Sequence, residues 1–337
     1  MNIKENISLK AYNTFGIDVC SSKYAEVSSE EDLQHLLADG ILKECPFVIL
    51  GGGSNIVFVK DFDGIVVHPT NKGISIISEN DSEAVVEAAA GEIWSDFAWM
   101  MTRQGYYGLE NLVEIPGCVG AAPIQNVGAY GREAKDVIKY VVVYEIATGT
   151  KKTFTNEECH FGYRNSIFKN ELKDRYIVLA VGFALSKTME VTTNYSALTN
   201  MLCEKNITSP TPLQIAECIA EIRRQKLPDP KEIGSAGSFF KNPIVTHSHL
   251  EILKATYPNI VCYPSGEHYK LAAGWLIEQC GWKGRSLGQV GVYDKQALVL
   301  FNKGGCSGAE VVNIANAIVA DVESKFGVRL EKEAIII

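Results

Sequence analysis

The sequence predicts an α+β fold with more than one domain. β-Branched and aromatic segments follow one another with few helices between them as far as Leu185, which is not the regular βαβ alternation of a doubly wound parallel sheet. The composition then changes between Lys187 and Pro212, and helix signals follow. We therefore place a domain boundary within residues 190–210.

Composition and charge exclude several classes of protein. The chain has 337 residues, of which 46% are hydrophobic and 21% charged, as in an ordinary globular protein. Its net charge of −8 argues against nucleic acid and anionic membranes as partners. No apolar run approaches the roughly 20 residues that span a bilayer, and the segment before Val19 lacks the apolar centre of a secretion signal. We expect a cytoplasmic protein without a membrane-inserted segment.

The first elements lead to a short glycine loop. Ser28 and Glu31 have capping-box spacing, which predicts a helix over Ser28–Leu37. Phe47–Leu50 reads as a buried strand that runs directly into Gly51–Asn55, and such loops often present backbone N–H groups to phosphate. The loop lacks the third glycine of a dinucleotide-binding fingerprint and the Gly-Lys-Ser/Thr of a Walker loop, so a plain tight turn explains it equally well.

The rest of the first half alternates strands with one helix. The apolar stripe of Trp94, Phe97, Ala98 and Met101 predicts a helix over Trp94–Gln104 that faces a core. Strands are predicted from β-branched content and flanking turns at Gly64–Val67, Ala84–Ala90, Val137–Ile146 and Tyr176–Leu185.

Between these elements lies a glycine-rich stretch, Glu114–Gly131, with the sequence EIPGCVGAAPIQNVGAYG. Small residues let a backbone turn sharply and approach a flat or phosphorylated group closely. Gln125 and Asn126 add amide groups that donate and accept hydrogen bonds. A surface loop is the alternative, but the length of the run and its near lack of charge favour a cofactor-binding loop.

Helix signals dominate the second half. Thr211, Pro212 and Gln214 begin a helix that ends near Arg224. The remaining predictions are a helix over about Lys270–Cys280, a strand Ala297–Phe301, a long helix from Ser307 with Glu310 in a capping box and Gly327 at its end, and a short strand Glu333–Ile337.

Few residue patterns indicate metal or hydrolytic chemistry. His247 and His249 have no accompanying carboxylate or thiol cluster, so a solvated loop explains them and we expect no metal site. No Gly-x-Ser-x-Gly elbow is present. The nine cysteines never form a Cys-x-x-Cys pair and read as reduced thiols.

Three polar residues stand in unusual surroundings. Arg164 lies in an aromatic-flanked loop, Ser238 precedes two phenylalanines, and Glu333 precedes the apolar C-terminal residues. Taken singly, each has a structural explanation: a surface arginine, a turn serine and an edge glutamate.

A resemblance connects these residues. The segments IPGCVGAAPIQNVGAYG, FGYRNSIFK, GSAGSFFKNP, KLAAGWLIEQCGWKG and LEKEAIII resemble the UDP-N-acetylenolpyruvoylglucosamine reductase family, a peptidoglycan-pathway flavoenzyme, in the family's order and from about Ala11 onward. TNYSALTNML is similar to the tyrosine-bearing insert of its longer subtype. Lys332 replaces an expected proline, so Glu331 is an alternative to Glu333.

The resemblance implies a flavin domain and a substrate domain. The flavin domain, of the vanillyl-alcohol-oxidase (PCMH) type, would span residues 1–200 in two subdomains split near residue 70, with the strand 328–337 returning to it; residues 205–327 would bind substrate. FAD would be bound non-covalently. The residues expected to hold it are Gly51, Gly52, Gly53, Ser54, Asn55, Pro116, Gly117, Gly120, Ala121, Gln125, Asn126, Gly128, Ala129, Tyr130, Gly131 and Tyr163.

The resemblance also implies a reaction, in which NADPH reduces FAD and the flavin then passes hydride to an enolpyruvyl ether on a sugar nucleotide. Arg164 and Glu333 would stabilise the enolate, and Ser238 would protonate carbon. We expect a monomer with small-molecule partners only. The expected substrate contacts are Tyr195, Lys226, Asn242, Tyr263, Lys270 and Gln296.

Two other functions compete with this one. A flavin oxidase on the same domain would typically tether FAD through His or Cys, and Cys118 lies in the relevant loop although no family-like tether is evident. A sugar-nucleotide-binding module without catalysis would lack the arginine, serine or glutamate, yet all three residues are in place.

Overall fold

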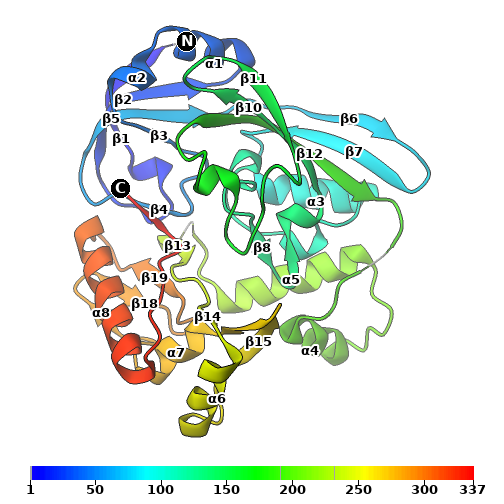
Figure 1. Ribbon diagram of the computed structural model, residues 1–337, viewed down its shortest axis with the longest axis vertical. Coiled ribbons are helices and arrows are strands. Elements are labelled where there is room, and N and C mark those ends of the chain that lie inside the picture. The colour runs from blue at the N-terminus through cyan, green and yellow to red at the C-terminus, as the bar shows by residue number, and fades with distance from the viewer. Residues whose placement is uncertain (1, 190, 231) are drawn as a thin grey trace. The chain divides into compact units, whose positions relative to one another are not determined.

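The computed structural model describes residues 2–189, 191–230 and 232–337, and its ribbon is shown in Figure 1. The chain divides into two compact units, each made of stretches that are separate in the sequence. Unit 1 comprises Met1–Ile7, Ser21–Gly52 and Asp63–Arg224, and unit 2 comprises Ser8–Cys20, Gly53–Phe62 and Gln225–Ile337. The division expected at residues 200–205 separates a flavin-binding part from a substrate-binding part. The two units are instead defined by how compactly the chain packs, so they do not test that division.

The first sheet of unit 1 is small and is covered by α1 (Glu30–Ala38). Its strand order is β1 (Ile3–Ser8), β2 (Cys20–Val27), β5 (Phe62–Pro69), β3 (Phe47–Ile49). Strands β3 and β5 are parallel, and α2 (Ile41–Glu44) follows α1. Leu33, Leu36 and Leu37 of α1 are buried in a core with Ile65 and Val67 of β5.

The start of α1 differs from the expectation by one residue. The N-cap is Ser29, not Ser28, because the Ser29 hydroxyl accepts the Asp32 N–H at 3.0 Å. The Ser28 hydroxyl instead donates to the Asp32 carboxylate at 2.6 Å. Two adjacent serines compete for the same first turn, and sequence spacing alone does not separate them.

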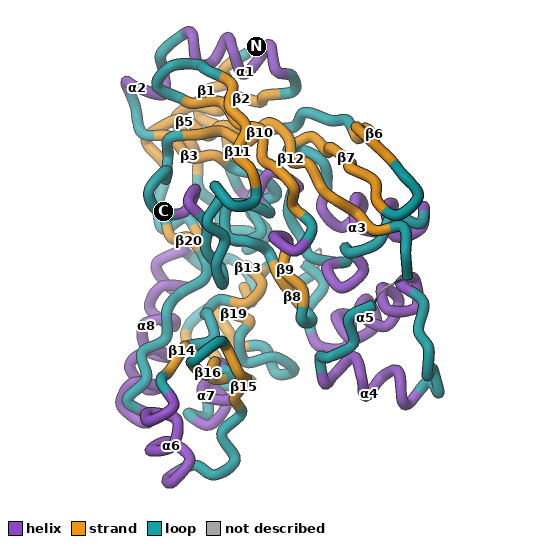
Figure 2. Tube along the Cα trace, turned by 45° about the vertical axis from the view of Figure 1, so that its right-hand side comes forward, coloured by secondary structure: helices purple, strands orange, loops and turns teal. Residues whose placement is uncertain are grey.

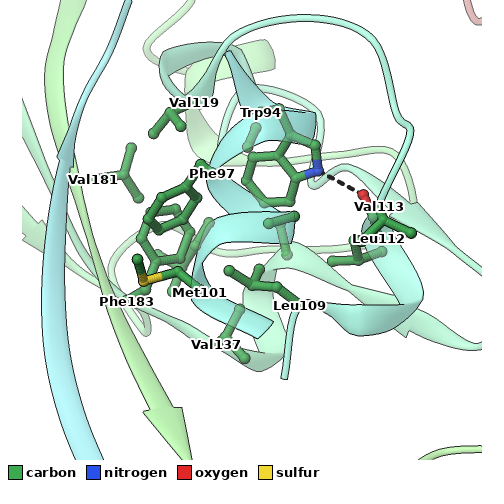
Figure 3. Close-up of a cluster of buried hydrophobic side chains, with 14 of the residues drawn as sticks. Trp94, Phe97, Met101, Leu109, Leu112, Val113, Val119, Val137, Val181 and Phe183 are labelled. Carbon is green, nitrogen blue, oxygen red and sulfur yellow. Dashed lines mark hydrogen bonds between the residues drawn. The ribbon is translucent and has the colours of Figure 1, made fainter. Parts of the chain in front are cut away.

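The second sheet of unit 1 is antiparallel and five-stranded. Its order is β11 (Lys151–Thr155), β10 (Ile138–Glu145), β12 (Tyr176–Ser186), β7 (Glu83–Ala89), β6 (Ile74–Glu79). Helix α3 (Trp94–Gln104) lies along one face of this sheet, and Figure 3 shows Trp94, Phe97 and Met101 packed with Phe183. The Trp94 indole N–H donates to the Leu112 carbonyl at 2.8 Å.

Two later helices pack against the same core. Leu198 of α4 (Ser196–Glu204) and Ile215 of α5 (Pro212–Lys226) are buried in it.

The described residues of unit 2 form a four-stranded, a three-stranded and a two-stranded sheet together with helices, shown as tubes in Figure 2. The first sheet has the order β13 (Ser235–Ser238), β19 (Val299–Asn302), β18 (Val290–Val292), β17 (Ser286–Leu287). The second has the order β14 (Ile244–Val245), β16 (His268–Leu271), β15 (Cys262–Ser265). The helices are α6 (His247–Thr256), α7 (Ala273–Gln279) and α8 (Gly308–Phe326). A final strand, β20 (Ile335–Ile336), runs parallel to β4 (Ile56–Val57).

Two expectations in this half are wrong. His247 and His249 lie in the first turn of α6, whose N-cap Thr246 accepts the His249 N–H, rather than in a loop. The helix expected from about Lys270 begins only at Ala273. Lys270 instead belongs to β16, where it pairs with residues of two neighbouring strands, and tertiary pairing overrides the local helical pattern.

The capping box of α8 is confirmed, because Ser307 accepts the Glu310 N–H and the Glu310 carboxylate accepts the Ser307 N–H. We expect Ser307→Ala to lower the free energy of unfolding by about 1 kcal/mol, since one helix N–H loses its acceptor. Chemical denaturation measures this change. Ser286→Ala on the exposed strand β17 is the control and should change it by less than about 0.5 kcal/mol; equal effects of the two substitutions would contradict the capping role.

Candidate active site

The two glycine loops of the expected cofactor site touch each other in unit 1. A Cβ atom added at Gly52 would lie 2.9 Å from the Gly117 Cα, and one added at Gly51 would lie 3.6 Å from the Cys118 Cβ. A side chain at Gly52 therefore cannot be placed without moving the opposite backbone. Segments far apart in the sequence thus form one surface that consists largely of main chain.

The first part of the glycine-rich stretch is anchored to the residues between β7 and α3. The Gly117 carbonyl accepts the Trp94 N–H at 3.0 Å, and the Gly120 N–H donates to the Ala90 carbonyl at 2.9 Å. A Cβ added at Gly120 would lie 2.6 Å from the Ala90 Cβ. The loop consequently has one fixed path, which only small residues allow.

These loops fit a flat, phosphorylated cofactor. Gly52, Pro116 and Ala121 remain exposed although the backbones around them are packed tightly. Exposed main chain without bulky side chains allows the close backbone approach that pyrophosphate and ring systems require. Gly53, at φ 61°, belongs to unit 2, where an added Cβ would lie 2.0 Å from the Tyr12 carbonyl oxygen.

Arg164 lies beside the second part of the glycine-rich stretch. Its Nη2 donates to the Gly128 carbonyl at 2.7 Å, and its guanidinium carbon lies 5.3 Å from the centre of the Tyr163 ring. The Arg164 backbone has φ 53°, in the left-handed region that non-glycine residues rarely adopt. Gln125 also faces this loop, because its Oε1 accepts the Lys169 ammonium at 3.2 Å.

A second group of residues in unit 1 gathers around Tyr130. The rings of Tyr130 and Tyr195 meet edge to face, with centroids 5.1 Å apart, and Arg223 of α5 lies beside the Tyr130 hydroxyl. Burial raises the pKa of Tyr130 and lowers that of Arg223. The interaction between the two groups opposes both shifts but does not cancel them.

Sequence reasoning did not select Arg223. The available signal was its position three residues before Lys226, which places both cations on one side of the same helix.

In unit 2, the backbone brings Ser238 and Glu333 together. The Phe239 carbonyl, directly after Ser238, accepts the Glu333 N–H at 2.8 Å, and Phe240 pairs antiparallel with Lys332. Phe239 and Phe240 are fully buried. The terminal segment therefore runs alongside the residues that directly follow Ser238.

The choice between Glu331 and Glu333 has a geometric basis. The Glu331 carboxylate pairs with the Lys241 ammonium at 2.5 Å and its side chain is 70% exposed. Glu333 is half-buried, and its carbonyl accepts the Asn55 side-chain N–H at 3.2 Å, so it contacts the glycine loop. This arrangement favours Glu333.

The other expected substrate residues of unit 2 lie near α7. The Asn242 Oδ1 accepts the Ala273 N–H at 2.9 Å, and the Gln296 Oε1 lies 3.0 Å from where a Gly274 Cβ would be. Tyr263 and Lys270 are directly opposite each other on β15 and β16. Lys226, at the end of α5, is exposed. Asn242 and Gln296 thus lie beside the first residues of α7, and Tyr263 and Lys270 lie on the hairpin that precedes it.

Two kinds of feature are absent from the described residues. No helix within them has the length and apolarity needed to cross a membrane. Nor do His, Cys, Asp and Glu side chains gather there in any group of three or more that could hold a metal ion.

Comparisons with known proteins identify a family for each part of the chain. The FAD binding domain family matches residues 21–155, and the family "UDP-N-acetylenolpyruvoylglucosamine reductase, C-terminal domain" matches residues 229–337. Together with the structure they confirm the α+β fold, a vanillyl-alcohol-oxidase-type flavin domain followed by this C-terminal domain.

Relatives cover nearly the whole chain. The UDP-N-acetylenolpyruvoylglucosamine reductase of Pseudomonas putida is 46% identical over 98% of this chain and 97% of its own, and that of Vibrio vulnificus is 45% identical over 99% and 94%. The crystal structure of the Thermus caldophilus enzyme has a TM-score of 0.69 at 22% identity, covering 100% of this chain and 99% of its own, and so shares the fold. This chain therefore belongs to the UDP-N-acetylenolpyruvoylglucosamine reductase family.

Proposed function

We propose that this chain reduces UDP-N-acetylglucosamine enolpyruvate to UDP-N-acetylmuramate, with NADPH as reductant and FAD as bound cofactor, in the synthesis of peptidoglycan precursors. The observation that carries the proposal is 46% identity to such a reductase over nearly the full length of both chains. The presence of Arg164, Ser238 and Glu333 in matching motifs argues for a catalyst rather than a binding module without catalysis.

The two touching glycine loops would hold FAD through their main chain. When bound, FAD supplies the hydride chemistry that links NADPH to the vinyl carbon of the substrate. Burial raises the pKa of the Cys118 thiol, which makes the thiolate needed for a covalent tether scarce at neutral pH. We therefore expect non-covalent FAD.

Arg164 would stabilise the negative charge that develops next to the substrate carboxylate. Its bond to the Gly128 carbonyl fixes the guanidinium before substrate arrives, and a donor that needs no reorientation lowers the barrier most. Glu333 would act with it in a protonated or bridging state, as the family resemblance implies.

Ser238 would donate the proton that completes reduction at carbon. The hydroxyl is a weak acid, but its acceptor is a strongly basic carbanion, so placement matters more than acidity. Two features support it: buried Phe239 and Phe240 follow it and limit access of water, and Glu333 is bonded to the next carbonyl.

Polar side chains would bind the substrate. Lys226 and Lys270 would neutralise the diphosphate of the sugar nucleotide. Residues 205–327 would form the substrate domain, and residues 1–200 with the returning strand 328–337 the flavin domain. We further propose a cytoplasmic monomer.

The proposal predicts that the purified protein carries FAD which denaturation releases into the supernatant. Anaerobic NADPH should bleach the flavin absorbance, and UDP-N-acetylglucosamine enolpyruvate should restore it, because the substrate takes the reducing equivalents. Absorbance spectroscopy follows each step. Flavin that stays with the denatured chain, or that only oxygen reoxidises, would favour the tethered oxidase.

Arg164 and Ser238 should act in the second half-reaction. We expect Arg164→Ala and Ser238→Ala each to slow flavin reoxidation by the enolpyruvyl substrate about a hundredfold or more, while reduction by NADPH remains nearly intact. Rapid mixing measures the two halves separately. Ser238→Cys should retain more activity than Ser238→Ala, because a thiol still donates a proton; equal loss in both halves would point to a damaged flavin site.

The lysines should affect binding more than chemistry. Lys226→Ala and Lys270→Ala should each raise the substrate KM about tenfold or more, the scale of a lost charge-assisted hydrogen bond of about 1.5–3 kcal/mol. Steady-state kinetics checks this, with Lys254→Ala on the exposed face of α6 as the control for removing one positive charge. A KM unchanged from the wild type in both variants would place the diphosphate elsewhere.

A further inference from the structure

Two loops of unit 1 that are far apart in the sequence are joined side by side. The first is residues 124–128 of the glycine-rich stretch, and the second is residues 162–169, which contain Arg164. Asn126, Arg164, Ser166 and Lys169 each donate a side-chain hydrogen bond from one loop to the other. A catalytic arginine on an otherwise irregular segment is thereby connected to the loop that faces the cofactor.

The Asn126 side chain is fully occupied by this connection. It is completely buried, its Nδ2 donates to the Gly162 carbonyl and to the Glu133 carboxylate, both at 2.9 Å, and its Oδ1 accepts the Lys135 N–H at 2.9 Å. The sequence suggested Asn126 as a cofactor contact. With its amide engaged within the protein, only its main chain is available to a cofactor.

Ser166 provides the second fixed point. Its side chain is also completely buried, and its hydroxyl donates to the Ile124 carbonyl at 2.6 Å. Gly162 and Ser166 therefore hold the chain two residues before and two residues after Arg164. Lys169 adds a bond to the Arg164 carbonyl at 3.3 Å.

Arg164 needs such support. Its φ of 53° is disfavoured for a residue with a Cβ atom, and such conformations persist only where the surroundings impose them. Gly128 completes the fit, because a Cβ there would lie 3.2 Å from the Arg164 Nη1 and 2.9 Å from the Arg132 carbonyl. A side chain at Gly128 would therefore crowd both the Arg132 backbone and the guanidinium.

We propose that Asn126 and Ser166 are positioning residues for Arg164. They fix the loop that carries Arg164 relative to the glycine loop, and so fix the guanidinium that acts on the substrate. This inference rests on the proposed role of Arg164. A displacement of a catalytic group by about 1 Å can cost a hundredfold in rate, so loss of either fixed point should slow the step that uses Arg164 and spare the step that does not.

The test uses Asn126→Asp and Ser166→Ala in the full-length FAD-loaded protein. Aspartate has the size of asparagine and tolerates a left-handed backbone, but it cannot donate to the Gly162 carbonyl. We expect each substitution to slow reoxidation by the enolpyruvyl substrate about tenfold to a hundredfold, with reduction by NADPH changed less than about threefold. Ser166→Ala keeps the test available if Asn126→Asp does not fold.

A matched control separates positioning from general loss of structure. Asn71 is likewise buried in unit 1, and its Nδ2 donates to the Leu179 carbonyl at 2.9 Å. Asn71→Asp removes a comparable bond away from Arg164, so its two half-reactions should keep their wild-type ratio. If the Asn126 and Ser166 variants behave like this control, the positioning role is overturned.

A double-mutant cycle tests whether Ser166 acts through Arg164. In an Arg164→Met background, Ser166→Ala should cause no further slowing of reoxidation, because nothing remains to be positioned. Full additivity of the two losses would overturn the inference. If Arg164→Met slows reoxidation but Ser166→Ala and Asn126→Asp do not, only the positioning role is rejected. If Arg164→Met has no effect, the proposed role of Arg164 is rejected as well.

Discussion

The contact between Gly52 and Gly117 constrains the rest of unit 1. At 2.9 Å from a hypothetical Cβ to the opposite Cα, the two backbones meet with no space for a side chain. The contact joins the first sheet, whose strand β3 ends just before the loop, to the glycine-rich stretch. That stretch is anchored by Trp94, the first residue of α3, and by Ala90, which directly follows β7. A cofactor surface made of main chain requires that both loops be fixed from behind, and the large core around Phe97 and Phe183 provides that support.

Some of the strained backbone positions lie in or beside the candidate site. Glu114, Asn126, Tyr130 and Arg164 all have positive φ values between 50° and 60° without being glycine. Each such residue costs free energy that the surrounding contacts must offset. For Asn126 and Arg164 those contacts are visible as side-chain hydrogen bonds to neighbouring carbonyls.

Local sequence signals predict the elements whose structure depends mainly on interactions between residues close in the sequence. The stripe of α3 and the capping box of α8 were correct because helix periodicity and caps are short-range properties. The clamp around Arg164 could not be found in this way, because Asn126 and Gly162 are 36 residues apart and Ser166 and Ile124 are 42 apart. Lys270 was misassigned for the same reason, since its strand exists only through its partners. The site residues themselves came from motif resemblance, not from periodicity.

The C-terminal segment is held in place by several short elements, each of which is weak by itself. β20 has only two residues and pairs with an equally short β4, and a pair of that length has little stability of its own. The neighbouring contacts compensate: the Glu333 N–H is bonded to the Phe239 carbonyl, and the Glu333 carbonyl accepts the Asn55 side chain. Both main-chain groups of Glu333 are thus fixed. The backbone at Glu333 is therefore held between two segments of unit 2, one that directly follows Ser238 and one that contains Asn55 at the end of the glycine loop, so the position from which its side chain extends depends on both.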